Sequence, residues 1–332
     1  MAGITGMGTT FNLPNFVGDL FSISTEDTPF LSAIGGLTGG RPAVDKRFEW
    51  EFYDLRDADE TRQALEGADA PTAAERVRAN ASNVVEIHQE AVSISYTRQA
   101  VAARGGYSTT ARGTSPVADE LSWQTDQQLK QIARDVDKGF IVGTYQSPSD
   151  NTTPRKTRGL LEAIVTNVRD MTNSVPDIDD VNDLFQIAYQ NGGLLEGETR
   201  VLLCGPAMKR HLTKIFIREV GGTSGNGFYQ QSRNVGGVNL TQIETDFGTA
   251  SLMVDRYMPN GTIAAVSLEE CAPRILEIPG KGFLFFEELA KTGASTKGQI
   301  YGEIGLEYGN ERKHAKLINA TTPYDTLGLF GS

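Results

Sequence analysis

Apolar residues recur at helical spacing between Ser115 and Gly143, and this pattern predicts one long helix. Ser115 is a favourable N-cap, and Pro116 suits the first helical position. At about 1.5 Å per residue, such a helix would be roughly 40 Å long. Its other faces are charged, which excludes a membrane span and predicts a helix that packs one side on a sheet. The apolar stripe consists of Val117, Leu121, Leu129, Ile132, Val136 and Phe140.

A two-residue alternation predicts a pair of long strands upstream of this helix. Phe48, Trp50 and Phe52 lie on one face of the first strand, and charged residues lie on the other. Residues 56–80 are charged and turn-rich, and a second extended run follows from 81 to about 101. The apolar positions of this run change face midway, which indicates a strand that leaves one layer and enters another. They are Val85 and Ile87 on one side, and Val92, Ile94 and Tyr96 on the other.

Two strands joined by a charged tip form a projecting hairpin. An isolated hairpin is at best marginally stable in water. The aromatic face of this one therefore needs cover, either from its own subunit or from a neighbour. The alternation alone leaves both possibilities open.

The rest of the chain predicts three further regions. Residues 1–46 are rich in Gly, Thr, Ser and Asn, which is typical of an extended arm that becomes ordered against something else. Residues 177–267 combine amphipathic helices with short buried strands and predict a compact α/β domain, within which 221–237 is a glycine-rich loop. The alternation from Ile300 to Tyr308 predicts a returning β-sheet, the expected partner of the long helix. Ile300, Ile304, Leu306 and Tyr308 lie on its buried face, and Gln299, Tyr301, Glu303 and Glu307 lie on its solvent-exposed face. Gly309-Asn310 is the predicted turn, and residues 314–318 are the return strand.

Charge and composition narrow the class of protein. The 332 residues carry 31 basic and 42 acidic side chains, a formal net charge of −11. Tight binding to phosphates needs the opposite sign, so sequence-specific nucleic-acid binding is not expected. Cys204 and Cys271 are the only cysteines, too few for a disulfide framework, and we expect a reducing compartment. The chain shows neither a signal-peptide pattern nor an apolar run of transmembrane length, so we expect a soluble protein made in the cytoplasm.

Histidine and cysteine offer little candidate chemistry. His88, His211 and His314 lack metal-ligand spacing, and we expect His88 to lie on a solvated strand face. Cys204 ends a strand before a helix, where nucleophiles do occur. However, the following Gly205-Pro206 removes one backbone N–H, and no histidine is recognisably paired with the thiol. A structural buried cysteine is the expected role.

Other short motifs lack their context. Asp246-Phe247-Gly248 matches a kinase triplet without the accompanying catalytic loop, and the glycine-rich loop lacks the ending of a phosphate-binding loop. We therefore predict a protein that is not an enzyme, with no catalytic residues, no cofactor and no metal.

The order of these elements resembles that of a known family. An extended arm, a charged hairpin, a long helix, an α/β domain with a glycine-rich loop and a returning sheet are similar to the order in tailed-phage major capsid proteins of the Hong Kong 97 type. Short stretches also resemble an actinobacteriophage-like branch of that family. They are Thr28-Pro29-Phe30, Phe48-Glu49-Trp50, Ser95-Tyr96-Thr97, Leu203-Cys204-Gly205, Val254-Asp255-Arg256-Tyr257 and Tyr308-Gly309-Asn310.

The resemblance implies an α+β fold of the Hong Kong 97 phage capsid type in five segments. These are an N-terminal arm (1–46), an extended loop formed by the β-hairpin (47–101), a peripheral domain with the spine helix 115–143 (102–176), an axial domain with the glycine-rich loop 221–237 (177–267), and the returning β-sheet of the peripheral domain with the C-terminal tail (268–332). It also implies contacts between subunits through the hairpin and the glycine-rich loop. The residues expected in these contacts are Phe48, Trp50, Phe52, Arg56, Asp59, Glu60, Arg62, Phe228, Tyr229 and Arg233.

The same resemblance implies a structural protein, the major head protein of a bacteriophage. It would self-assemble as hexamers and pentamers into an icosahedral virion shell that encloses double-stranded DNA without sequence-specific binding. The expected partners are many copies of itself, a portal and a separate scaffolding protein, with a decoration protein as a further candidate and no membrane. Assembly is expected in the host cytoplasm. We expect Trp50→Ala to harm assembly more than subunit folding.

Two other interpretations stay open. An encapsulin-like compartment shell would share the fold but enclose a protein cargo. A cytosolic α/β enzyme with the hairpin as a lid would need a concave pocket with convergent polar groups and a titratable residue of perturbed pKa.

Overall fold

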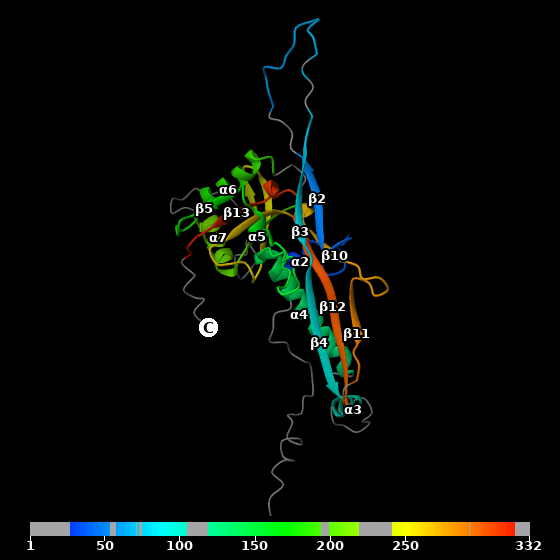
Figure 1. Ribbon diagram of the computed structural model, residues 1–332. Coiled ribbons are helices and arrows are strands. Elements are labelled where there is room, and N and C mark those ends of the chain that lie inside the picture. Colours follow the sequence, from blue (N-terminus) through cyan, green and yellow to red (C-terminus); the bar gives the residue numbers. More distant parts are fainter. Residues whose placement is uncertain are drawn as a thin grey trace, which may run out of the picture. The chain divides into compact units, whose positions relative to one another are not determined.

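The structure is a computed structural model (Figure 1). It describes residues 27–53, 58–70, 72, 75–104, 119–193, 199–218, 241–291 and 293–322. The chain divides into two compact units. Of the described residues, residue 27, those between 88 and 135 and those between 284 and 302 form the smaller unit, and the others form the larger unit.

The larger unit contains a six-stranded mixed sheet in the order β5-β13-β9-β6-β8-β7. Strand β6 pairs in parallel with β8 and antiparallel with β9. Every residue of β6 and β9 is buried, which explains why both strands are runs of mostly apolar residues without alternation. The strands are β5 (Val168–Asp170), β6 (Arg200–Cys204), β7 (Gln242–Thr245), β8 (Gly248–Val254), β9 (Ile263–Ser267) and β13 (Ala315–Ile318).

Helices α6 (Ile178–Gln190) and α7 (Pro206–Arg218) contribute to the core of this sheet region. Asp177 caps α6 in a capping box with Asp180, so two N–H groups at the helix start are satisfied. The buried face of α6 repeats at helical spacing, as the sequence predicted. This face consists of Val181, Leu184, Phe185 and Ala188, and Met208, Leu212 and Ile215 of α7 belong to the same core.

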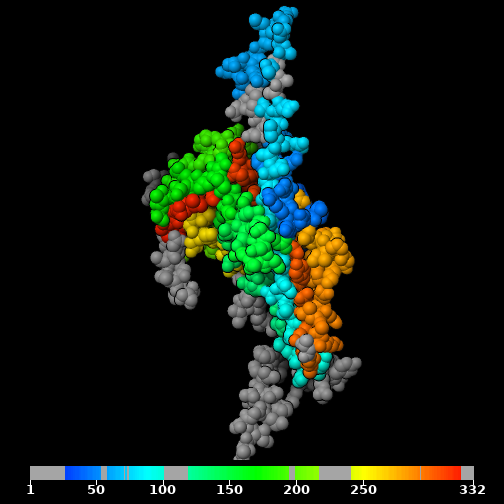
Figure 2. Space-filling model, in the orientation of Figure 1, coloured from blue at the N-terminus to red at the C-terminus, as the bar shows by residue number. Residues whose placement is uncertain are grey.

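A separate two-stranded sheet forms the hairpin, which also belongs to the larger unit. Strands β2 (Arg47–Tyr53) and β3 (Arg78–Val84) pair antiparallel from Arg47 opposite Val84 to Tyr53 opposite Arg78. Both strands belong to the predicted extended loop, and their pairing confirms that the sequence forms a hairpin here. Figures 1 and 2 show the described residues between these strands extending away from the rest of their unit.

A third sheet has the order β1-β10-β12-β11, and β4 also pairs with β12. Its strands are β1 (Arg41–Ala43), β4 (Glu86–Ser95), β10 (Ala272–Leu276), β11 (Leu284–Glu288) and β12 (Ser295–Glu307). The division into units falls within β4, β12 and helix α4 (Glu120–Val142). The short helices are α2 (Pro29–Ala33), α3 (Tyr96–Arg104), α5 (Leu160–Ala163), η1 (Leu268–Glu270) and η2 (Glu311–Lys313).

Within the smaller unit, polar contacts join segments that are distant in sequence. The Gln89 amide donates to the Gln299 side chain at 2.8 Å, which links β4 to β12. Arg98 of α3 pairs with Glu120, the first residue of α4, at 2.7 Å. A carboxylate at a helix N-terminus also interacts favourably with the macrodipole, so Glu120 has two stabilising partners.

The long helix is confirmed as α4 over Glu120–Val142, and the first predicted residues, 115–118, lie outside the described part of the chain. Ile132, Val136 and Phe140 of the predicted stripe are buried. No helix within the described residues has both the length and the apolar character needed to cross a bilayer.

The second extended run was predicted too long. The chain forms β3, then β4, and changes at Tyr96 into α3. Residues 99–104, Gln-Ala-Val-Ala-Ala-Arg, contain one β-branched residue among good helix formers, which favours a helix over a strand. The predicted change of face does occur, because the adjacent residues Val84 and Val85 are both buried where β3 gives way to β4.

Two residues near this change were assigned to the wrong face. Ile87 was predicted to be buried beside Val85, but it is 47% exposed. His88 was expected on a solvated face, but it is 8% exposed. In β4, residues two positions apart lie on the same face of the strand. His88 therefore lies on the same inward face as the buried residues Val92 and Ile94.

The end of the predicted arm and the wet face of the returning sheet also need correction. Phe30 and Leu31 are buried, and β1 pairs with β10, so α2 and β1 pack on their own chain. Glu303 and Glu307 of β12 were expected to be wet but are buried. They form ion pairs with Arg155 at 2.8 Å and with Arg274 at 2.6 Å, respectively, which offsets the cost of burying the carboxylates.

Candidate functional site: the hairpin and its base

The base of the hairpin is packed on its own chain. Phe48 is buried in a cluster with Ala43 and Val85, and Trp50 and Leu276 pack against this cluster. The ring of Phe48 lies directly over Gly305 of β12, where a Cβ atom would come within 2.8 Å of the ring. Only glycine leaves room for the aromatic side chain at this point.

Trp50 is the polar anchor of this base. Its indole Nε1 donates a hydrogen bond to the backbone oxygen of Gly309 at 2.7 Å. Its ring meets the ring of Tyr308 edge-on, with centroids 4.9 Å apart and an interplanar angle of 89°. Edge-to-face contacts of this kind are favourable for aromatic pairs, so Trp50 is fixed by both packing and a hydrogen bond.

Asn83 of β3 ties the same base to two further segments. This side chain is fully buried. Its amide donates to the backbone oxygens of Leu306 at 2.7 Å and Arg158 at 3.1 Å. Its side-chain oxygen accepts from the backbone N–H of Arg158 at 2.8 Å and of Val84 at 2.9 Å. All four hydrogen-bonding positions of the amide are therefore satisfied.

The distal part of the hairpin is exposed. Every described residue between 58 and 80 is exposed, including Leu65 at 86% and Val77 at 84%. Tyr53, at the end of β2, is also exposed. Scattered apolar residues are normal on a surface, but these lie on a segment whose described residues have little cover from their own chain (Figure 2).

Charged side chains give the distal part local order. Asp59 accepts hydrogen bonds from the Thr61 hydroxyl at 2.6 Å and from the Thr61 N–H at 2.9 Å. These two hydrogen bonds lower the pKa of the Asp59 carboxyl. The Nε atom of Arg62 lies 3.6 Å from Oδ2 of Asp59. Arg78 forms an ion pair with Glu51 at 2.6 Å across the two strands. Exposed ion pairs of this kind contribute little to stability. They therefore order the distal part of the hairpin locally but do not fix it to the rest of the subunit.

The structure thus separates the predicted contact residues into groups. Phe48 and Trp50 contact their own chain at the hairpin base, and Phe52 is half-buried. Asp59, Glu60 and Arg62 lie on the exposed distal part. Contacts of any of these residues with a neighbouring subunit stay a prediction. The remaining residues of the set lie outside the described residues: Arg56, Phe228, Tyr229 and Arg233.

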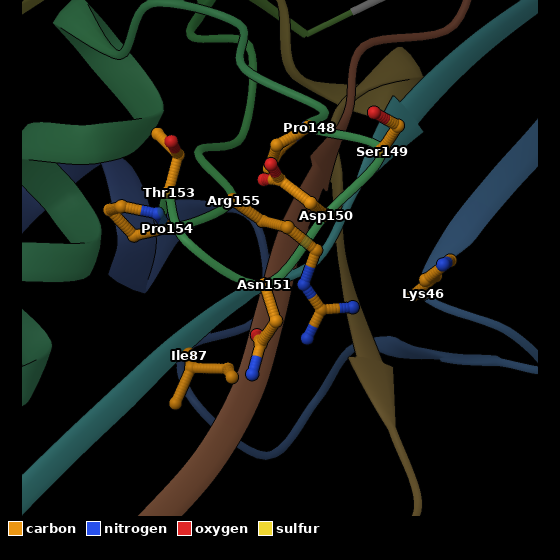
Figure 3. A pocket seen from close by; sticks show the side chains of 9 residues that line it. All are labelled: Lys46, Ile87, Pro148, Ser149, Asp150, Asn151, Thr153, Pro154 and Arg155. Carbon is orange, nitrogen blue, oxygen red and sulfur yellow. The ribbon is translucent and has the colours of Figure 1, made fainter.

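A cavity of about 330 Å³ lies beside the hairpin base (Figure 3). Lys46 and Ile87 line it together with the loop 148–155. Arg155 is the cationic end of the ion pair with Glu303 already described. The lining is polar and carries charges of both signs, with neither histidine nor cysteine among its residues.

The candidate nucleophile is buried. Burial raises the pKa of the Cys204 thiol to about 12 and outweighs the charge of Lys209, which acts in the opposite direction. Burial, with Glu270 and Glu307 nearby, raises the pKa of the Cys271 thiol still further. Both thiols therefore stay protonated and are poor nucleophiles at neutral pH. Among the described residues, no group of three or more His, Cys, Asp and Glu side chains is placed to hold a metal ion.

The segment that receives the hairpin was not recognised from the sequence. The sequence predicts a strand end at Tyr308, a turn at Gly309 and a return strand from His314, but no link from these residues to Trp50. The link joins residues 259 positions apart, and a periodic pattern carries no information on which distant segment covers a given face. A buried indole N–H needs an acceptor, which is the one signal that could have prompted the search.

The fold, with its projecting hairpin, is of the Hong Kong 97 phage capsid type. A family model described as the SU10 major capsid protein matches residues 3–321, and the chain belongs to this family. It is therefore a structural capsid subunit of the tailed-phage major capsid class, and the resemblance drawn from the sequence is confirmed at this level. Its place in an actinobacteriophage-like branch stays a prediction.

Solved capsid structures are similar to this chain in fold. The capsid asymmetric unit of cyanophage A-1(L) has a TM-score of 0.61 at 13% identity and covers 94% of this chain and 98% of its own. The capsid of a native GTA particle has a TM-score of 0.60 at 12% identity, and the match covers 96% of this chain and 98% of the GTA chain. The holo-SrpI encapsulin complex from Synechococcus elongatus has a TM-score of 0.53 at 12% identity and covers 96% of both chains. No curated protein sequence matches this chain.

Proposed function

We propose that copies of this chain assemble as hexamers and pentamers into an icosahedral head around double-stranded DNA, and that each distal hairpin lies over a neighbouring copy. Docking of the hairpin on a neighbouring copy is supported by the difference between the fixed base and the exposed distal part of the hairpin. Its base is fixed by Phe48, Trp50 and Asn83, whereas Leu65 and Val77 are more than four-fifths exposed. A pre-positioned base lowers the entropy that the distal part must lose when it docks.

The exposed apolar residues supply a driving force for that docking. Full burial of a Leu or Val side chain contributes about 1.5–3 kcal/mol. The same contact would recur at every copy in a closed shell, so a modest contribution per hairpin adds up over the particle. The charged residues Asp59, Glu60 and Arg62 would then set the partner and the alignment rather than the affinity.

The other parts of the proposal are supported by the family and by the charge. The chain would act without catalysis, and assembly would take place in the host cytoplasm with a portal and a separate scaffolding protein, a decoration protein being an additional candidate. The net charge of −11 supports enclosure of DNA without adhesion to it. The five-segment domain division, and the contacts of Phe228, Tyr229 and Arg233 near the centre of each capsomer, belong to this proposal.

Two variants test the hairpin directly. We expect Leu65→Asp and Val77→Asp to leave the soluble subunit folded, as judged by circular dichroism, and to reduce the yield of closed particles in negative-stain images at least tenfold. Val44→Asp is the matched control, because Val44 is exposed to a similar degree at the opposite end of the hairpin. Normal particles from both hairpin variants would refute hairpin docking.

The contents of the particles test the remaining alternatives. DNA inside native particles is the expected result, and a protein cargo would favour the encapsulin-like shell. A chain that stays monomeric with scaffold present would refute the shell assignment. In that case, the alternative of an α/β enzyme with the hairpin as a lid would be tested by substitutions in the cavity lined by Lys46 and Arg155.

A further inference from the structure

The imidazole of His314 is held in one neutral tautomer by two backbone groups. Its Nδ1 accepts a hydrogen bond from the Ser267 N–H at 3.3 Å. Since Nδ1 is an acceptor, the ring proton lies on Nε2, which donates to the backbone oxygen of Tyr308 at 2.8 Å. The side chain is fully buried. The ring therefore links the end of β9 to the connection between β12 and η2, residues 308–310.

The 308–310 connection is also the segment that holds the hairpin. His314 engages the oxygen of Tyr308, and Trp50 engages the oxygen of the next residue, Gly309. The Tyr308 ring packs edge-on against Trp50, and its hydroxyl accepts from Arg158 at 3.2 Å. Displacement of the His314 ring would therefore disturb the acceptor and the aromatic partner of Trp50 together.

Two carboxylates on the adjoining elements form ion pairs with other residues. Glu270 of η1 pairs with Lys313 at 2.6 Å, and Glu307 of β12 pairs with Arg274 at 2.6 Å. These ion pairs offset the attraction that the carboxylates would exert on an imidazolium. The further charged residues on these elements are Glu269 of η1, Glu311 and Arg312 of η2, Lys316 of β13, Arg200 of β6 and Arg158.

We infer that His314 is an acid-sensitive latch for the base of the hairpin. A solvent proton added at Nδ1 would point an N–H at the N–H of Ser267, so protonation removes this hydrogen bond and disfavours the closed arrangement. Displacement of the charged ring then releases the Tyr308 oxygen and loosens Trp50. The closed state binds one proton fewer than the open state, so acid favours opening. The ratio of closed to open molecules should fall about tenfold per pH unit below about pH 6.5.

Trp50 reports the latch directly. The chain has two tryptophans, and Trp123→Phe leaves Trp50 as the sole indole. In the full-length subunit with this background, we expect Trp50 emission to shift to longer wavelength between pH 7.5 and pH 5.0, with the steepness of a single proton. His314→Gln should abolish the pH step. His88→Gln and His211→Gln are the matched controls and should retain it.

Two results would overturn the latch. One is Trp50 emission that stays constant across this pH range together with unchanged hydrogen-exchange protection of residues 47–53. The other is a step that survives in His314→Gln or disappears in His88→Gln or His211→Gln. If His314→Gln fails to fold, hydrogen exchange of the unmutated chain decides the question. After correction for the intrinsic exchange rate, the exchange of peptides covering 47–53 and 305–310 should rise together, by about tenfold for each pH unit of acidification. Unchanged protection of these peptides would refute the latch.

The opening itself is intramolecular and does not depend on the proposed function. Its consequence for assembly does rest on that function, because a loosened base would make docking of the hairpin less favourable. Particles with a pH-independent Trp50 signal would refute only the latch. A pH-dependent Trp50 signal in a chain that never forms particles would refute only the shell.

Discussion

The indole N–H of Trp50 donates to the backbone oxygen of Gly309 at 2.7 Å, across 259 positions of sequence. This hydrogen bond joins the first strand of the hairpin to the 308–310 connection near the end of the chain. It makes the hairpin base part of the folded larger unit and leaves the distal residues exposed. Residues that fold the subunit and residues available for assembly are thereby separated along one hairpin.

The anchor changes the effect expected for Trp50. Trp50→Ala removes the ring contact with Tyr308 and leaves the Gly309 oxygen without this donor, so we expect the free energy of unfolding to fall by about 2–4 kcal/mol. Trp50→Phe keeps most of the packing and should cost about 1 kcal/mol. Urea titration of the soluble subunit measures both. Full stability of Trp50→Ala would restore the expectation that this substitution harms assembly more than subunit folding.

Whether the hairpin aromatics were covered by their own subunit could not be predicted from the alternation. The pattern of Phe48, Trp50 and Phe52 correctly indicated a strand with one apolar face. The cover comes from Gly305 of β12 and from Tyr308 directly after β12, and the local pattern there says nothing about β2. Pairing between distant segments is decided by shape and hydrogen-bond satisfaction, which are not periodic along the chain.

Short-range patterns were informative elsewhere, but only within one element. The 3.6-residue spacing correctly indicated α4 and the buried face of α6. His88 was misplaced because its acidic neighbours suggested a wet face, although its even number matches Val92 and Ile94. Glu303 and Glu307 were misplaced because burial of a carboxylate depends on a distant cation, here Arg155 and Arg274.

Gly309 should tolerate no side chain. Its φ is +56°, and a Cβ atom would lie 2.1 Å from Glu270 Oε2, whose carboxylate also pairs with Lys313. Gly280 is a matched control, because its φ is +80° and a Cβ there would meet nothing within 4 Å. We expect Gly280→Ala to cost about 1–2 kcal/mol for the left-handed backbone alone. Gly309→Ala should cost clearly more, and equal losses in thermal unfolding would contradict the steric argument.

The two thiols should be unreactive in the folded subunit. Burial raises the pKa of Cys204 to about 12, and Cys271 is shifted in the same direction, so the thiolate fraction at pH 8 is very small. A disulfide-exchange reagent should titrate close to zero thiols per native chain and two per chain in denaturant. Rapid reaction of one thiol in the native subunit would show that its site opens readily.

Glu311 should produce a separate acid transition at lower pH. Burial acts to raise the pKa of this carboxyl, but hydrogen bonds from the Thr166 hydroxyl and from the N–H groups of Thr166 and Val165 outweigh it, and the pKa is lowered. A lowered folded-state pKa stabilises the fold above the unfolded value of about 4.3, and this contribution is lost as the pH falls further. Glu311→Gln should therefore flatten the decline in stability below about pH 4.5 without altering the Trp50 response expected nearer pH 6. If Glu311→Gln instead removed the response near pH 6, the carboxylate rather than His314 would control the hairpin base.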